Sequence, residues 1–137
     1  MEIKYELYQH QKECLDYSKK KNKFILADQM GLGKSLESIC VAIDKKGEVK
    51  HCLIICCVNG MQYTWKHEIE NATYESARIL GDRLGKKTKK WSIKGNKEKL
   101  EDLDNLGDEY FIITNIEVFR NKDMVDKITT LCKKGII

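Results

Sequence analysis

Short apolar runs alternate with amphipathic segments along the chain, and this alternation limits the folds open to it more than any other feature of the sequence. Apolar runs of the kind that form buried strands lie at residues 24–27, 52–58, 77–80 and 110–114. Apolar residues at helical spacing lie at residues 8–21, 36–43, 61–69, 97–106 and 124–132. Strands that alternate with helices predict an α/β fold with a mostly parallel sheet flanked by helices.

The composition fits a single folded domain. The chain has 137 residues, of which 42% are hydrophobic and 34% charged, a balance that argues against disorder. No apolar run approaches the roughly 20 residues of a membrane span, and the start lacks the pattern of a signal peptide. The six cysteines form no Cys-x-x-Cys pair and mostly lie in apolar segments, which indicates small buried residues rather than a zinc site or disulfides. We therefore expect a cytoplasmic protein without a membrane partner.

The segment Asp28–Ser35 follows an apolar run and precedes a helix, which is the setting of a phosphate-binding loop. Asp28 replaces the first glycine of the usual Walker pattern, but the glycines, lysine and serine that end the pattern are present. Glycines let the backbone turn its N–H groups toward a phosphate, Lys34 can bridge the outer phosphates as the candidate catalytic residue, and Ser35 can bind Mg²⁺. The residues expected to hold the phosphates are Asp28, Gly31, Leu32, Gly33, Lys34 and Ser35. The alternative is an ordinary glycine turn between a strand and a helix.

This loop closely resembles the Asp-Glu-Met-Gly-Leu-Gly-Lys-Thr/Ser loop of the Swi/Snf-type DNA translocases of helicase superfamily two, with Gln29 in place of Glu. Residues 7–13 resemble the upstream glutamine motif of that family, which implies that Gln11 contacts adenine. A carboxamide can both donate to and accept from the adenine edge, and would thereby select ATP over GTP. Residues 53–57, 65–69 and 112–117 resemble the next blocks of the family in the same order, and turns near residues 58–60 and 79–81 look like the compact phage and prophage versions. The resemblance covers nearly the whole chain.

The resemblance implies a first RecA-like lobe that uses ATP and Mg²⁺. In such lobes an Asp-Glu pair at the carboxyl end of a buried strand binds Mg²⁺ and orients water. The Asp108-Glu109 pair precedes its strand and lies at the wrong end of it. We therefore expect residues 1–137 to be the N-terminal portion of lobe one, ending before the Walker B Asp-Glu motif, with lobe two absent and no ATP hydrolysis by this part alone.

Polar residues follow two of the predicted strands and are the candidate nucleic-acid contacts. Asn59 and Gly60 follow the run at 52–58, and Thr114 and Asn115 end the run at 110–114. Ligands of open α/β sheets bind beyond the carboxyl ends of the strands, so these residues are expected to border the same crevice as the phosphate loop. By the resemblance they would hold the backbone of double-stranded DNA, the partner of the parent protein. Helix capping by the two asparagines is the alternative.

A lysine-rich segment at residues 86–99 carries the net positive charge of the chain. It holds seven lysines and one glutamate, a local charge of +6 in a chain of net charge +4, and Trp91 lies among them. Lysines can neutralise phosphates, and an aromatic ring can stack on a base. A solvated surface loop is the alternative.

The predicted function is that of the ATP-binding portion of an ATP-dependent double-stranded DNA translocase or helicase-like remodeller. Two alternatives stay open. One is a different phosphate-loop enzyme, although the Asn-Lys-x-Asp signature of GTPases fails at Asn96 and Asn121 and no arginines cluster as in a kinase lid. The other is a module that binds nucleotide or DNA without turnover.

Overall fold

The structure is a computed structural model that describes residues 2–137, and it confirms the α/β class. A parallel sheet has the strand order β1–β5–β2, and a separate antiparallel pair joins β3 to β4. The strands are β1 (Cys52–Cys56), β2 (Ala77–Ile79), β3 (Asp82–Leu84), β4 (Trp91–Ile93) and β5 (Phe111–Asn115). The helices are α1 (Gln9–Lys19), α2 (Lys34–Asp44), α3 (Asn59–Ala72), α4 (Asn96–Asp104), the short 3₁₀ helix η1 (Ile116–Arg120) and α5 (Lys122–Lys133).

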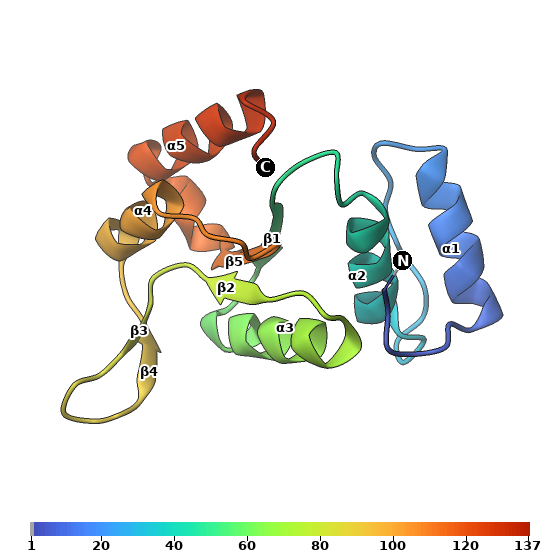
Figure 1. The fold of residues 1–137 in the computed structure, drawn as a ribbon, viewed down its shortest axis with the longest axis horizontal. Helices are drawn as coiled ribbons and strands as arrows, with labels where there is room; N and C mark the ends of the chain where they lie inside the picture. The colour runs from blue at the N-terminus through green and yellow to red at the C-terminus, as the bar shows by residue number, and fades with distance from the viewer. Residues whose placement is uncertain (1) are drawn as a thin grey trace.

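The central strand β5 is buried on both faces, which explains its continuous apolar sequence. Alternate side chains of a strand point to opposite faces, so Phe111 and Ile113 belong to one core and Ile112 to the other. The first core adds residues of α2 and α3, and α3 covers this face of the sheet in Figure 1. The second core adds residues of α4, η1 and α5, which lie on the opposite face. The sheet is therefore the middle layer of three, as the alternation of elements predicts.

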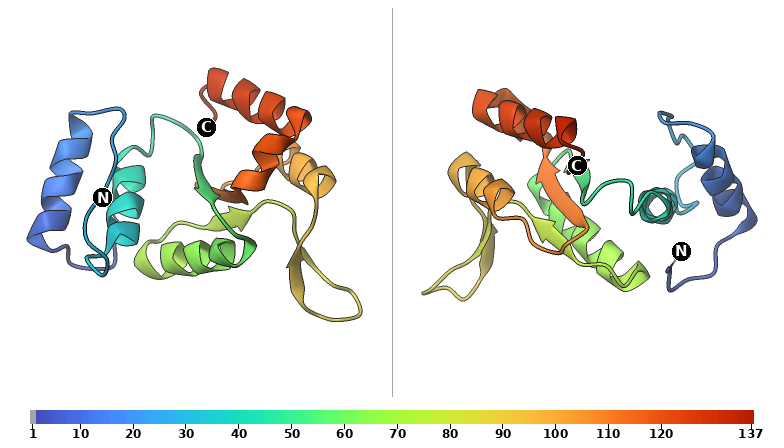
Figure 2. Two further views of the ribbon diagram at one scale, coloured as in Figure 1. Left: turned by 180° about the vertical axis from the view of Figure 1, so that it is seen from behind. Right: turned by 45° about the horizontal axis from the view of Figure 1, so that its top comes forward.

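The predicted strand at residues 24–27 is wrong. This segment has no regular secondary structure, and the side chain of Ile25 is 91% exposed. Figures 1 and 2 show it running beside α1 and α2, away from the three-stranded sheet. An extended apolar segment becomes a strand only where a neighbouring backbone satisfies its N–H and C=O groups, and no described strand lies next to this one.

The outer edge of β1 has one backbone contact to the end of the chain. The N–H of His51, just before β1, donates to the carbonyl of Ile136 at 2.9 Å. The sequence predicts the start of a strand at residues 136–137, and this contact places the backbone of Ile136 beside β1, although the segment is not itself a strand.

The lysine-rich segment is more ordered than its sequence predicts. It begins in the turn of the β3–β4 hairpin and contains β4, and this hairpin projects away from the body of the molecule in Figures 1 and 2. Gly81, with a φ of +79°, turns the chain from β2 into β3. None of the helices described for residues 2–137 combines the length and apolar character that crossing a membrane requires.

Candidate functional site

The predicted phosphate loop leads directly into α2, as its sequence context requires. Gly31 and Gly33 have φ angles of +83° and +81°, a left-handed conformation that glycine adopts without steric cost. The first turn of an α-helix leaves backbone N–H groups without intrahelical partners, and that end carries a partial positive charge. Loop and helix start together form a backbone arrangement suited to anions.

The Lys34 ammonium is folded back onto the loop. Its Nζ donates to the backbone carbonyls of Asp28 at 2.7 Å and Gln29 at 3.0 Å. Hydrogen bonds between an ammonium and an anion are stronger than those to neutral carbonyls. A phosphate in the loop would therefore compete well for this ammonium.

A cavity of about 580 Å³ opens against the loop. Its walls come from the loop, from the start of α2, from Tyr5 and from the C-terminal half of α3. The lining residues are Tyr5, Met30, Gly31, Gly33, Lys34, Ser35, Leu36, Ile39, Glu68, Asn71 and Ala72. Glu68 and Asn71 have no site role in the sequence analysis, although Glu68 lies in one of the blocks that carry the family resemblance. Tyr5 precedes every recognised block, so no sequence signal marks it.

Gln11 is buried between α1 and the loop. Its side chain is 3% exposed, and its Oε1 accepts a hydrogen bond from the N–H of Tyr8 at 2.9 Å, which caps α1. A Cβ atom on Gly33 would lie 2.6 Å from Gln11 Nε2, so the amide packs directly on the loop. Gln11 also lines a second cavity of about 660 Å³, which shares Tyr5 and Leu36 with the cavity at the loop.

An unpartnered carboxylate lies behind the loop. Glu37, in the first turn of α2, is 1% exposed, and neither of its carboxylate oxygens has a hydrogen-bond partner among the described residues. Burial, followed by the nearby Asp28 carboxylate, raises the pKa of Glu37, while His10 and Lys34 act in the opposite direction. His10 Nε2 lies 4.0 Å from the Glu37 carboxylate. No sequence signal marks Glu37, because burial of a charged side chain depends on how α1 packs over α2.

The candidate nucleic-acid residues meet where β1 and β5 end. Asn115 Nδ2 donates to Asn59 Oδ1 at 2.7 Å, so the end of β5 contacts the start of α3. Lys99 Nζ donates to Asn115 Oδ1 at 3.2 Å, and burial lowers the pKa of Lys99. Thr114 and Asn115 are buried, and the Thr114 hydroxyl has no partner among the described residues. Asn59 and Gly60 are exposed, so they form the accessible part of this group.

The alternative interpretation of Asn59 as a helix cap is wrong by one position. Asn59 is the first residue of α3, and Val58 occupies the N-cap without a side-chain hydrogen bond. Gln62 Nε2 instead donates to Asn59 Oδ1 at 3.2 Å. The Asn59 oxygen thus accepts from two side-chain amides and fixes the geometry of this edge.

The candidate nucleic-acid residues do not line the cavity at the phosphate loop, and a crevice shared by the two groups stays a prediction. Glu68, Asn71 and Ala72 of α3 line the cavity at the loop, whereas Asn59 and Gly60 begin that helix. At about 1.5 Å per residue, the two groups lie on the order of 15 Å apart along α3. Residues 24–27 form no strand, and the cavity at the loop is walled by α3 instead of by the end of a neighbouring strand.

The Asp108-Glu109 pair lies before β5, as predicted. Glu109 is not simply solvated, because its carboxylate accepts from the N–H of Gly107 at 3.1 Å and from Arg78 at 3.5 Å. Within residues 2–137, no three His, Cys, Asp or Glu side chains gather closely enough to hold a metal ion.

Comparison with known families adds an independent result. The family model of the SNF2-related domain matches residues 8–134. The chain therefore belongs to the SNF2-related family of helicase-like ATPases, whose members act on DNA and generally use ATP and Mg²⁺. No curated protein matches the chain significantly.

Proposed function

We propose that this chain is the ATP-binding portion of the first RecA-like lobe of an ATP-dependent double-stranded DNA translocase or helicase-like remodeller. One observation carries the proposal. The two left-handed glycines, the start of α2 and Lys34 all border a cavity that shares two lining residues, Tyr5 and Leu36, with the cavity lined by Gln11. A phosphate-binding end and an adenine-binding end would then lie next to each other, as one nucleotide requires.

The residues present fit ATP with Mg²⁺. The backbone from Asp28 to Gly33, Leu32 included, would surround the phosphates, Lys34 would exchange its two carbonyl partners for phosphate oxygens, and Ser35 would ligate Mg²⁺. When bound, the metal supplies charge neutralisation for phosphoryl transfer. Gln11 would contact adenine once its amide turns from the Tyr8 N–H toward the second cavity.

Calorimetric titration of the chain with Mg²⁺-ATP tests the assignment. Lys34→Ala should weaken binding at least tenfold, because it removes the one ammonium held in the loop. Lys23→Ala is the matched control, since Lys23 is an exposed lysine close to the loop in sequence. Circular dichroism should show the same helix content in all three proteins. Equal ATP affinity in Lys34→Ala and parent would overturn the phosphate-loop assignment.

Asn59, Gly60, Thr114 and Asn115 are proposed to support contact with the DNA backbone, with Asn59 and Gly60 as its accessible members. Asn59→Asp would place a negative charge against phosphates and should weaken duplex binding several-fold, whereas the exposed Asn22→Asp should not. We further propose that residues 1–137 form only the N-terminal portion of lobe one, so that they bind ATP without hydrolysing it.

A further inference from the structure

We propose that the hairpin of β3 and β4, with the chain that leads from it into α4, is a second and separate nucleic-acid contact that grips the phosphate backbone without regard to sequence. We call residues 84–97 the cationic arm. The choice of DNA as partner rests on the proposed function. That the arm binds a phosphate backbone is inferred from its charge and from the contacts that anchor it.

No acidic side chain within the cationic arm balances its positive charge. Residues 84–97 contain no aspartate or glutamate. The six lysines of the arm are all exposed, and none takes part in an ion pair of the described structure. These lysines are Lys86, Lys87, Lys89, Lys90, Lys94 and Lys97. The remaining residues carry a net charge of −2, so the arm accounts for the net positive charge of the chain.

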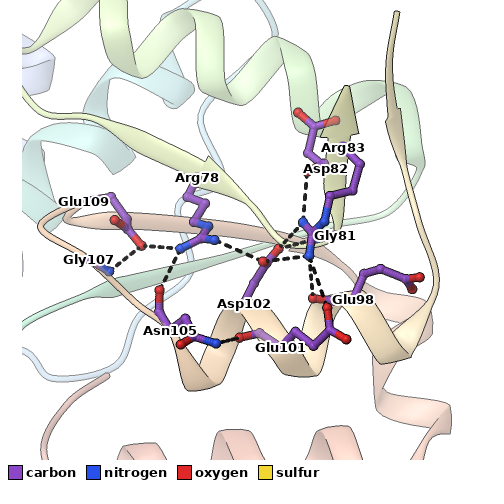
Figure 3. Close-up of polar contacts among 10 residues, drawn as sticks. All are labelled: Arg78, Gly81, Asp82, Arg83, Glu98, Glu101, Asp102, Asn105, Gly107 and Glu109. Carbon is purple, nitrogen blue, oxygen red and sulfur yellow. Dashed lines mark hydrogen bonds and ion pairs between the residues drawn. The ribbon is translucent and has the colours of Figure 1, made fainter. Parts of the chain in front are cut away.

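The base of the arm shows the opposite arrangement, because its charges are paired. Figure 3 shows Arg78 and Arg83 converging on the Asp102 carboxylate of α4, with N–O distances of 3.0 Å. The N–H of Gly81 donates to the same carboxylate at 2.7 Å. Burial alone would raise the pKa of Asp102, but Arg83, the Gly81 N–H and Arg78 together hold it below its ordinary value. Asp102 is therefore an ionised anchor for both arginines.

Two further contacts fix the direction of the arm. Tyr63 donates its hydroxyl to the Asp82 carboxylate at 2.7 Å, which ties β3 to α3. The N–H of Lys94 donates to the carbonyl of Gly81 at 2.8 Å and closes the base of the hairpin. An isolated two-stranded hairpin is marginally stable at best, so these contacts hold an element that its own strands could not maintain.

The anchored arm also presents an aromatic surface beside its lysines. Trp91 pairs with Leu84 across the hairpin, and the two side chains are 61% and 49% exposed. Lysines next to an exposed aromatic ring are the combination that binds nucleic-acid backbone and stacks on unpaired bases. Tyr63 lies one helical turn after Asn59, so the base of the arm adjoins the exposed asparagine at the start of α3. A duplex held by Asn59 and Gly60 could extend along the arm.

The test is a salt titration of binding to a 20-base-pair DNA duplex, without nucleotide, for three chains of residues 1–137. The arm variant carries Lys86→Gln, Lys87→Gln, Lys89→Asn and Lys90→Gln; asparagine suits position 89, where φ is +55°. The control variant replaces Lys12, Lys20, Lys21 and Lys23 with glutamine. These four exposed lysines lie in and just after α1, at the opposite end of the molecule from the hairpin in Figure 1.

The arm variant should bind more weakly, and the slope of log affinity against log salt should fall by about 0.9 for each lysine that contacts a phosphate. The control should keep the slope of the parent chain. An equal effect in both variants, or none in either, would overturn the proposal. If the arm variant does not fold, the Lys86→Gln, Lys87→Gln double variant should still lose part of the slope, and an unchanged slope there would equally overturn it.

Two further measurements distinguish nucleic acid from an acidic protein, and single-stranded from duplex DNA. Polyglutamate of matched charge should not compete with the duplex at equal charge concentration, and effective competition would overturn the choice of nucleic acid in favour of an acidic protein. Trp91→Ala should weaken binding to single-stranded DNA more than to duplex. Equal ATP affinity in Lys34→Ala and the parent chain, together with the expected fall in salt slope for the arm variant, would remove the nucleotide proposal and leave this one standing, so the two can fail independently.

Discussion

Gln11 occupies the space that a side chain at position 33 would need: a Cβ atom on Gly33 would lie 2.6 Å from Gln11 Nε2. This contact joins the glutamine motif to the phosphate loop through Gln11 and Gly33, which are 22 residues apart in the sequence. The same position has a φ of +81°, so the backbone conformation favours glycine there, and any larger residue would also require the Gln11 amide to move.

Gly33→Ala should therefore destabilise the chain more than Gly31→Ala. Both glycines have left-handed φ angles, and alanine at either costs about 1 kcal/mol or more in backbone strain. Only at position 33 must Gln11 also move, because nothing lies within 4 Å of a Cβ on Gly31. Thermal unfolding of the two variants measures the difference, and equal losses in Tm would show that the Gln11 contact contributes nothing.

Gln11→Ala should narrow the preference for ATP over GTP. It should also lower stability by about 1 kcal/mol, because the cap that Gln11 forms with the Tyr8 N–H is lost. Lys12→Ala is the control, since Lys12 is an exposed residue of the same helix that lines neither cavity. Competition titrations with both nucleotides give the ratio of affinities, and an unchanged ratio would restrict Gln11 to a structural role.

Glu37→Gln should stabilise the chain increasingly as pH rises. The pKa of Glu37 is raised in the folded state, so the folded chain binds more protons than the unfolded one above about pH 4.3, the ordinary value for glutamate. Stability is then lost as pH rises from that value through the folded pKa, and the loss persists above it. Glutamine carries no charge and therefore removes this loss. The free energy of unfolding should rise by on the order of 1 kcal/mol at pH 8.

The predicted pH dependence is checked by measuring Tm from pH 4 to pH 8. The proteins compared are the parent chain, Glu37→Gln and the control Glu13→Gln. Glu13 is an exposed carboxylate on α1, so its removal should leave the pH profile of the parent. A constant difference between Glu37→Gln and parent at all pH values would contradict the titration of Glu37.

The sequence predicts those parts of the fold that depend on local pattern. The helix over α2 follows from the spacing of Ile39, Cys40 and Ile43, and β5 follows from its continuous apolar run. Residues 24–27 have an equally apolar pattern, but a strand also needs a neighbour to pair with, and that is a tertiary property. The sequence does not predict the β3–β4 hairpin for a similar reason. The hairpin is stabilised by the contact between Arg83 and Asp102, which are 19 residues apart in the sequence.

In the candidate site, too, some features follow from local sequence and others depend on tertiary packing. The glycine conformations of the loop follow from the motif, whereas the burial of Glu37 and Gln11 and the approach of Glu68 to the loop depend on how helices pack. The contact between Asn59 and Asn115 follows from the parallel register of β1 and β5, in which Cys56 pairs with Asn115. The sequence therefore predicts which residues meet at the strand ends, but it does not predict how far they lie from the phosphate loop.

The last prediction concerns turnover: residues 1–137 should bind ATP and release no phosphate above background. Asp108 and Glu109 precede β5, and Glu117, which follows it, pairs with Arg120 at 2.9 Å. Arg78 and Arg83 are both committed to Asp102, so all three arginines of the chain have acidic partners. An arginine supplied to the transferred phosphoryl group is worth about 10³–10⁵ in rate in related enzymes, and none of these three is placed to supply it.

Phosphate release is measured with and without duplex DNA, for the parent chain and for Lys34→Ala. If the chain is the N-terminal portion of lobe one, a chain extended through both lobes should show DNA-stimulated turnover that residues 1–137 lack. Turnover by residues 1–137 that disappears in Lys34→Ala would contradict this and reveal a carboxylate acting at the loop. Glu68 would be the first to test, because it is the acidic side chain that lines the cavity at Lys34 and Ser35, and Glu68→Gln should then abolish that turnover while ATP binding persists.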